Sequence, residues 1–292
     1  MKNNEVFFFD TETDSLDFRT GKIKLIAFSK GLNEVVTTTS VGERLKSILN
    51  DKNIIKVFHN AKFDVGFFQS KCHRVNNYHC TLLMAQVLGE EKLSLKALAK
   101  KYLDVDMDKS MQHSDNWQET EITQEHIDYA VKDVEYTRAL YYKLLDLLVE
   151  NNLLTVYERE RRALPAIVML ESNGINMEFD KWNARLDDDR RLAIELEIRI
   201  KDLLNRKELN LNSPKQLVEA IAEYGIKLHS TSDDELAKYS DGHEVIKLIR
   251  KYRRLQTKIK TYGEKLKIFI NDDGRIRADL EINRCKFRKN VL

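Results

Sequence analysis

The first sixty residues contain short runs of β-branched and aromatic side chains separated by turn-forming residues, which is typical of β-strands. These runs cover residues 5–9, 23–29, 34–39 and 54–60. Apolar residues three and four apart then indicate helices over residues 41–50, 62–71, 79–89, 93–103 and 124–150. Strands with interleaved and following helices predict an α/β fold in which helices flank a mixed sheet.

Beyond residue 152 the pattern is mostly helical. It predicts helices over residues 155–172, 179–206, 213–224 and 242–269, with a short strand-like run at 274–280. Ser213 and Gln216 form a capping box with a proline between them, and Ser232 with Glu235 repeats this start signal. A helix over 242–269 would be about 42 Å long, more than the core of a small domain requires, so we expect it to project. We therefore predict two domains, residues 1–152 and residues 153–292.

Charge is distributed unevenly between these two parts. Residues 155–292 hold 29 Lys/Arg and 24 Asp/Glu, whereas the preceding residues hold 20 and 23. The stretch 247–267 contains nine basic residues and one acid, Glu264. A basic second part beside a slightly acidic first part favours an anionic partner that one part holds and the other part processes.

Composition excludes several protein classes. Among 292 residues there are three cysteines, two prolines and ten glycines, which disfavours a disulfide framework, long disordered linkers and repeats. The apolar run Val6–Phe9 is too short for a signal peptide, and no stretch is long enough to span a membrane. We expect a cytoplasmic protein.

Candidate chemistry lies in carboxylates on three separate elements. Asp10 and Glu12 directly follow the first strand, and strand alternation places both on one side of the chain. Asp64 follows the fourth strand, and Asp133 lies on the long helix with Tyr129 one turn before it. Converging carboxylates repel one another unless a hard divalent cation lies between them, and Mg²⁺ and Mn²⁺ prefer such oxygen ligands. The set therefore predicts two metal ions that assist phosphodiester cleavage.

Three motifs carry a resemblance to a known family. They are Phe8-Phe9-Asp10-Thr11-Glu12-Thr13, His59-Asn60-Ala61-Lys62-Phe63-Asp64 and Tyr129-Ala130-Val131-Lys132-Asp133. With them the sequence resembles the 3′→5′ exonuclease domain of family A (DNA polymerase I-like) DNA polymerases. This domain belongs to the tyrosine-type branch of the DEDD exonuclease superfamily, and Tyr129 indicates that branch. The resemblance implies a ribonuclease H-like sheet and removal of nucleotides from DNA 3′ ends, as in proofreading.

The resemblance also implies a role for each residue. Asp10, Glu12 and Asp133 would bind the tighter metal ion, and Asp10 would bridge to a second ion. Asp64 would act on the second ion largely through water. Tyr129 would orient the attacking water through its phenol, because a group with a pKa near 10 is a poor base at neutral pH.

Two further residues would seat the terminal nucleotide, and one position departs from the family. By the same resemblance, Leu16 and Asn60 would contact the 3′ end. Relatives usually have an aspartate before the segment Thr81–Ala85, where this chain has Cys80. We interpret that position as one that supports the site and does not bind metal.

The second half resembles the part of family A polymerases that leads into the thumb. The resemblance covers residues 155–281 and implies a helical clamp along duplex DNA. Its binding residues would be Arg250, Arg253, Arg254, Lys258 and Lys260, which neutralise phosphates without base contacts. After Glu281 the residues do not match the polymerase palm and fingers, so no polymerase active site is expected in this chain. A separate polymerase subunit is a possible partner.

Two other functions are compatible with parts of this sequence. The chain could be a DNA-binding module or scaffold of a split or truncated polymerase, but the four carboxylates and Tyr129 argue for catalysis. It could instead trim RNA, as ribonuclease D-like enzymes do. Those enzymes would be expected to have a compact helical RNA-binding domain in place of the thumb-like segment.

Overall fold

The computed structural model describes residues 5–107, 117–118 and 121–280. The chain divides into two compact units, one made of Met1–Asn173 with Ala278–Leu292 and the other of Gly174–Arg277. The second unit is therefore inserted into the sequence of the first. Each unit is described by itself below.

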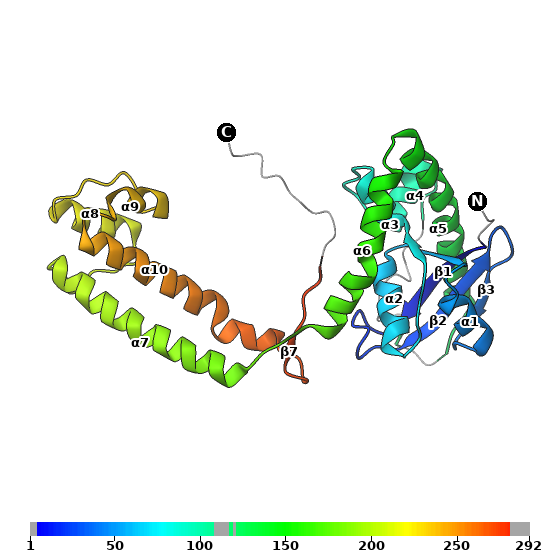
Figure 1. Cartoon of the computed structure of the whole chain (residues 1–292), viewed down its shortest axis with the longest axis horizontal. Helices are drawn as coiled ribbons and strands as arrows, with labels where there is room; N and C mark the ends of the chain where they lie inside the picture. The colour runs from blue at the N-terminus through cyan, green and yellow to red at the C-terminus, as the bar shows by residue number, and fades with distance from the viewer. Residues whose placement is uncertain (1–4, 108–116, 119–120, 281–292) are drawn as a thin grey trace. The chain divides into compact units, whose positions relative to one another are not determined.

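The first unit is built on a mixed five-stranded sheet in the order β3-β2-β1-β4-β5. The strands are β1 (Val6–Thr13), β2 (Ile23–Lys30), β3 (Val36–Thr38), β4 (Ile55–Phe58) and β5 (Tyr78–Cys80). β1, β2 and β3 pair antiparallel, whereas β4 pairs parallel to both β1 and β5. Helices flank this sheet (Figure 1), so the predicted ribonuclease H-like α/β fold is confirmed.

The apolar residues of β1 divide between the two faces of the sheet. Phe8 packs against Tyr141 and Tyr142 of α5 (Gln124–Glu150), with ring centroids 5.6 and 5.7 Å apart. Phe9 points to the opposite face, where it stacks on Phe58. Phe8 and Phe9 are fully buried, and each contributes about 1.5–3 kcal/mol by leaving water. Strand alternation therefore fixes which face each following β1 side chain occupies.

The remaining helices of the first unit complete its core. They are α1 (Glu43–Asn50), α2 (Ala61–Ser70), α3 (Thr81–Val87), α4 (Leu95–Leu103) and α6 (Leu154–Asn173). α6 belongs to this unit because Tyr157, Leu164 and Val168 are buried in the same hydrophobic cluster as the sheet. The division between compact units thus falls after α6, later than the domain boundary predicted at residue 152.

The second unit is mostly helical. It contains α7 (Phe179–Leu203), α8 (Pro214–Glu223), α9 (Asp233–Tyr239), α10 (Glu244–Tyr262), the 3₁₀ helix η2 (Glu264–Phe269) and the short paired strands β6 (Ile175–Asn176) and β7 (Arg275–Ile276). Ser213 and Ser232 cap α8 and α9, as their sequences predicted. No helix in the described part of the chain is long and apolar enough to cross a membrane.

α10 is shorter than predicted and does not stand alone. It ends at Tyr262, and η2 follows it. It runs antiparallel to α7 (Figure 1), with the Trp182 indole donating to the Tyr262 carbonyl at one end and Arg199 paired with Glu244 at the other. The predicted extent of this helix to residue 269 was therefore wrong, and the buried residues of α10 lie in one hydrophobic cluster with residues of α7, α8 and α9.

Candidate active site

Asp10 and Glu12 lie on the same face of β1 as Phe8, the face that α5 covers. The register of β1 against β2 pairs Asp10 with Ala27 and Glu12 with Leu25. Both neighbours are buried apolar residues, so the two carboxylates stand on the central strand of the sheet beside apolar side chains. The predicted alternation has therefore brought both acids into one space.

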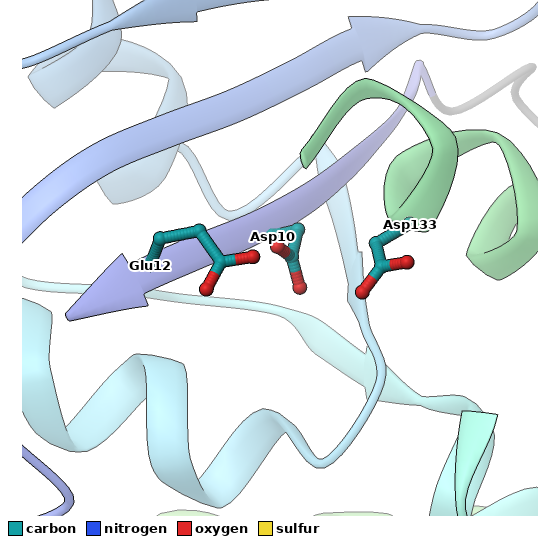
Figure 2. Close-up of side chains that lie close together, drawn as sticks. All are labelled: Asp10, Glu12 and Asp133. Atoms are coloured by element: carbon teal, nitrogen blue, oxygen red, sulfur yellow. The ribbon is translucent and has the colours of Figure 1, made fainter. Parts of the chain in front are cut away.

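Asp133 comes to the same place from α5. The buried stripe of this helix includes Ala130, Asp133, Val134 and Thr137, so an acid occupies a position that would otherwise be apolar. Asp133 is 9% exposed. Figure 2 shows its carboxylate directed toward those of Asp10 and Glu12.

The three carboxylates are close enough to share one cation. One oxygen atom from each of Asp10, Glu12 and Asp133 lies within 4.8 Å of the others. Oδ2 of Asp10 is buried and has no hydrogen-bond partner among the described residues. A buried carboxylate oxygen without a partner costs free energy, and a hard divalent cation bound to it would remove that cost. The residues present therefore fit the predicted metal.

Asp64 lies beside this group but is held differently. It lies in the first turn of α2, and its Oδ1 accepts hydrogen bonds from the backbone N–H of Thr11 at 3.1 Å and from the Thr11 hydroxyl at 2.7 Å. Thr11, between Asp10 and Glu12, points to the other face of β1. Sequence reasoning missed its role, because no local pattern pairs Thr11 with an acid 53 residues away.

The electrostatics of the site follow from burial and crowding. Burial, followed by the nearby negative charge of Asp64, raises the pKa of Asp10 to about 7. Burial raises the pKa of Asp64 to about 7, against the opposing effect of the Thr11 hydrogen bonds. Burial and the charges of Asp10 and Asp133 raise the pKa of Glu12 well above its usual value. Three neighbouring acids whose pKa values are all raised are a feature of functional sites.

Tyr129 lies one helical turn before Asp133 and next to the acids. Burial, then the charges of Asp133, Glu12 and Asp10, raise the pKa of its phenol, which also hydrogen-bonds to Asp133. The phenol therefore stays protonated at neutral pH and can donate or accept a hydrogen bond. The ring packs near Trp117, with centroids 6.4 Å apart.

The two residues predicted to seat the 3′ end are exposed. Leu16 is 78% exposed in the segment that follows β1. Asn60 has a left-handed backbone (φ 62°) and immediately precedes α2, with no side-chain hydrogen bond to the helix. Both side chains are accessible to a ligand, but the structure does not group them with the carboxylates.

Cys80, which departs from the family pattern, contacts both α3 and the helix that carries Asp64. Its Sγ accepts hydrogen bonds from the backbone N–H of Leu83 at 3.5 Å and of Ala61 at 3.4 Å. It therefore caps α3 and holds the first residue of α2, the helix that carries Asp64. Burial raises the pKa of the thiol, which keeps it protonated at neutral pH.

In the second unit, the predicted DNA-binding residues form part of a basic face on α10. Five basic side chains of this helix line a hollow of about 420 Å³: Lys247, Arg250, Lys251, Arg254 and Lys258. Asp233 pairs with Arg250 at 2.7 Å and with Arg254 at 3.5 Å, and Asp189 pairs with Lys258.

Two further predicted residues of α10 differ in their availability. Arg253 is half-buried and donates to the carbonyl and the hydroxyl of Thr231. Lys260, in contrast, is exposed. Arg253 is therefore the least suited of the five predicted residues to bind phosphate.

This fold and this acidic site define a nuclease domain. A family model described as 3′-5′ exonuclease, of the DNA polymerase A type, matches residues 1–149. The chain belongs to this family, and the resemblance inferred from its motifs is confirmed.

Similarity to two DNA polymerases extends beyond that segment, over most of the chain. The chain is 26% identical to DNA polymerase I of Aquifex aeolicus, over 96% of this chain and 52% of the relative. It is 28% identical to the DNA polymerase of Escherichia phage T5, over 92% of this chain and 37% of the relative. The chain thus spans about half or less of the length of these relatives.

Solved structures show similar folds. The POL domain of Pol1 from M. smegmatis, in complex with DNA primer-template and dNTP, matches 94% of this chain and 48% of its own, with a TM-score of 0.70 and 16% identity. Brucella melitensis NrnC bound to pGG matches 61% of this chain and 90% of its own, with a TM-score of 0.54 and 22% identity. The first similarity extends over both units.

Proposed function

We propose that this chain is a 3′→5′ exonuclease that removes nucleotides from DNA 3′ ends with the help of two divalent ions, Mg²⁺ or Mn²⁺. The observation that supports it best is the grouping of Asp10, Glu12 and Asp133, in which Oδ2 of Asp10 is buried without a hydrogen-bond partner among the described residues. The reaction would take place within residues 1–152. Bound there, the ions would activate water and stabilise the departing 3′ oxygen.

Each candidate residue of the site would have a part in this reaction. Asp10, Glu12 and Asp133 would hold one ion, and Asp10 would bridge to the other, on which Asp64 would act largely through water. Asp64 is kept in place for this by Thr11. The protonated phenol of Tyr129 would orient the attacking water. The exposed Leu16 and Asn60 would contact the terminal nucleotide.

The basic face of α10 would hold the duplex within the mostly helical part predicted over residues 153–292. Lysines and arginines that neutralise phosphates release counterions and need no base contacts. DNA is favoured over RNA because similarity to DNA polymerases extends over more than nine tenths of the chain. Similarity to the exosome complex component 10 homolog of Drosophila melanogaster, at 31% identity, covers 37%. A separate polymerase subunit remains a proposed partner.

The test uses a DNA duplex labelled at the 5′ end of a strand whose mismatched 3′ end is exposed to the enzyme. Cleavage is followed with Mg²⁺, with Mn²⁺ and with a chelator, for the wild type, Asp133→Ala and Asp128→Asn. Asp128 is a matched control because it is an exposed acid on the same helix. A metal-dependent ladder that shortens from the 3′ end, absent with Asp133→Ala and retained with Asp128→Asn, is expected.

Two results would contradict the proposal. Cleavage by Asp133→Ala at the wild-type rate would remove Asp133 from the site. Tight DNA binding by the wild type without any cleavage would favour the scaffold function. The same assay with a matched RNA strand tests the substrate class, because faster RNA trimming would favour the ribonuclease D-like alternative.

A further inference from the structure

Lys62 lies in the first turn of α2, two residues before Asp64, and its ammonium group is enclosed by acceptors. It donates to Oε1 of Glu171 at 2.7 Å, to the carbonyl of Leu280 at 2.8 Å and to the carboxylate of Asp279. A lysine has three N–H donors, so all of them are used. The side chains of Lys62 and Glu171 are only 19% and 9% exposed.

Both charges stand at the end of a helix where the helix dipole disfavours them. The N-terminus of a helix is electropositive and its C-terminus electronegative. Lys62 is the second residue of α2, and Glu171 is in the last turn of α6. Neither charge stabilises its own helix. Their pairing offsets both unfavourable placements, which points to a role in joining the two helices.

The chain segment that returns from the second unit completes the join. The backbone N–H of Leu280 donates to the same Oε1 of Glu171 at 2.6 Å. Lys62, Glu171 and the pair Asp279–Leu280 therefore form one closed network within the first unit. We refer to it as the α2–α6 cross-link.

The first turn of α2 is thereby fixed from two directions. On one side Asp64 accepts two hydrogen bonds from Thr11 of β1. On the other side the α2–α6 cross-link holds Lys62. The position of the Asp64 carboxylate relative to Asp10 depends on both attachments, because a single turn of helix connects them.

We propose that Lys62 and Glu171 are positioning residues for the exonuclease site, which act by fixing the first turn of α2 so that Asp64 faces the ion it shares with Asp10. The inference rests on the proposed function, because it concerns the same site. Residues 279–280 are part of the α2–α6 cross-link. The segment that returns from the second unit is thereby attached to the helix that carries a metal-binding acid.

The energetics predict a distinctive pattern among variants. Lys62→Met keeps the apolar stem but leaves Glu171 as a buried charge without its cation, which is more harmful than removing both partners. The double variant Lys62→Met with Glu171→Gln should therefore be closer to wild type than Lys62→Met alone. Lys62→Arg keeps the charge and should retain most of the function.

The experiment uses the full chain and measures two quantities in each variant. The first is the Mg²⁺ concentration that gives half-maximal cleavage of a DNA 3′ end, with KM for DNA measured alongside. The second is the rise in Tm that saturating Mg²⁺ produces relative to chelator. Lys100→Met is the matched control, because Lys100 is 58% exposed and pairs with Asp104 on the surface of α4.

For Lys62→Met we expect a Mg²⁺ midpoint raised about tenfold or more, the usual effect of losing a group that orients a metal ligand. KM for DNA should stay nearly unchanged, and the Mg²⁺-induced rise in Tm should shrink. Lys100→Met should match wild type in both measurements. A Lys62→Met protein with a wild-type Mg²⁺ midpoint and a wild-type Tm response would overturn the inference, whatever its stability in chelator.

Failure of the inference and failure of the proposed function are distinguishable. If wild type cleaves and Lys62→Met responds to Mg²⁺ as wild type does, the exonuclease stands and the positioning role is refuted. If wild type binds Mg²⁺ but cleaves nothing, and Lys62→Met loses the Tm response, the positioning role stands and the exonuclease is refuted.

Discussion

Replacing Asp64 with asparagine should make the metal-free protein more stable at pH 8. The change removes one negative charge from a crowded, buried site and keeps the side-chain shape. The amide oxygen of asparagine can still accept both hydrogen bonds from Thr11, which now reach Oδ1 of the acid. The variant therefore isolates the cost of the charge.

The size of the effect follows from the pKa. Asp64 has a pKa raised from 3.8 to about 7, a difference of about 3 units. At about 1.4 kcal/mol per unit, the charge of Asp64 destabilises the folded state by at most about 4 kcal/mol. The amide of the variant is itself buried, and an incompletely bonded polar group costs about 1–3 kcal/mol. A net gain of about 2 kcal/mol is expected, or about 4–8 °C in Tm for a domain of this size.

The pH dependence has a definite sign. Because the folded pKa of Asp64 is raised, the folded state binds the proton more tightly than the unfolded state does. Wild-type stability therefore falls as pH rises from about 4 to about 7, and the advantage of the variant appears over the same range. At pH 4 the carboxyl is protonated in the folded state and only partly ionised in the unfolded state, so most of the advantage has disappeared, and it vanishes as the pH falls further.

Thermal unfolding followed by circular dichroism in chelator, at pH 4 and pH 8, measures this directly. Saturating Mg²⁺ should then raise the Tm of wild type more than that of Asp64→Asn, because the ion stabilises the charge that the variant lacks. An Asp64→Asn protein that is less stable than wild type at pH 8 in chelator would refute the electrostatic reasoning.

Three further variants test other parts of the molecule. Gly66→Ala would place a Cβ 2.9 Å from the ring of Phe18 and displace the segment after β1. We therefore expect a raised KM for DNA ends and a stability loss of about 1–3 kcal/mol. Gly42→Ala, whose added Cβ meets no atom within 4 Å, is the control. Tyr129→Phe should lower kcat about 100-fold, the lower range for a positioned proton-transfer group. The shape of the pH–rate profile between pH 6 and 9 should not change, because the raised pKa keeps the Tyr129 phenol protonated over that range. A changed profile would assign Tyr129 a titrating role. Asp233→Asn frees the two arginines it pairs with and should tighten duplex binding about two- to fivefold, the cost of an exposed ion pair, with a steeper salt dependence; unchanged binding would place the duplex elsewhere.

Sequence alone predicted the sheet and the long helices, because their apolar periodicity extends over many residues. α5 matches its predicted bounds, residues 124–150. β5 was missed, because its three residues continue into α3 without a turn. The end of α10 was also missed, although Gly263 marks it: any Cβ there would collide with the carbonyl of Ile259.

The candidate site was predictable as far as its motifs are local in sequence. Asp10, Glu12 and Asp133 were identified from strand alternation and from their elements, and the structure brings them together. The partners of α2 were not predictable. Thr11 and Glu171 lie 53 and 109 residues from the side chains they bind, and no local pattern records such a pairing.

The insertion of the second unit has a consequence for the order of events during synthesis. Residues 1–173 contain the sheet and its helices and emerge from the ribosome before the second unit is complete. Domains generally fold as they emerge, starting from the N-terminal side. Asp279 and Leu280 emerge last of the described residues. Lys62 and Glu171 can therefore contact these two residues only after residues 174–277 have been synthesised. In a nascent chain the carboxylates would thus come together before the α2–α6 cross-link forms. A newly made nuclease would then gain full activity only after its second unit has been synthesised.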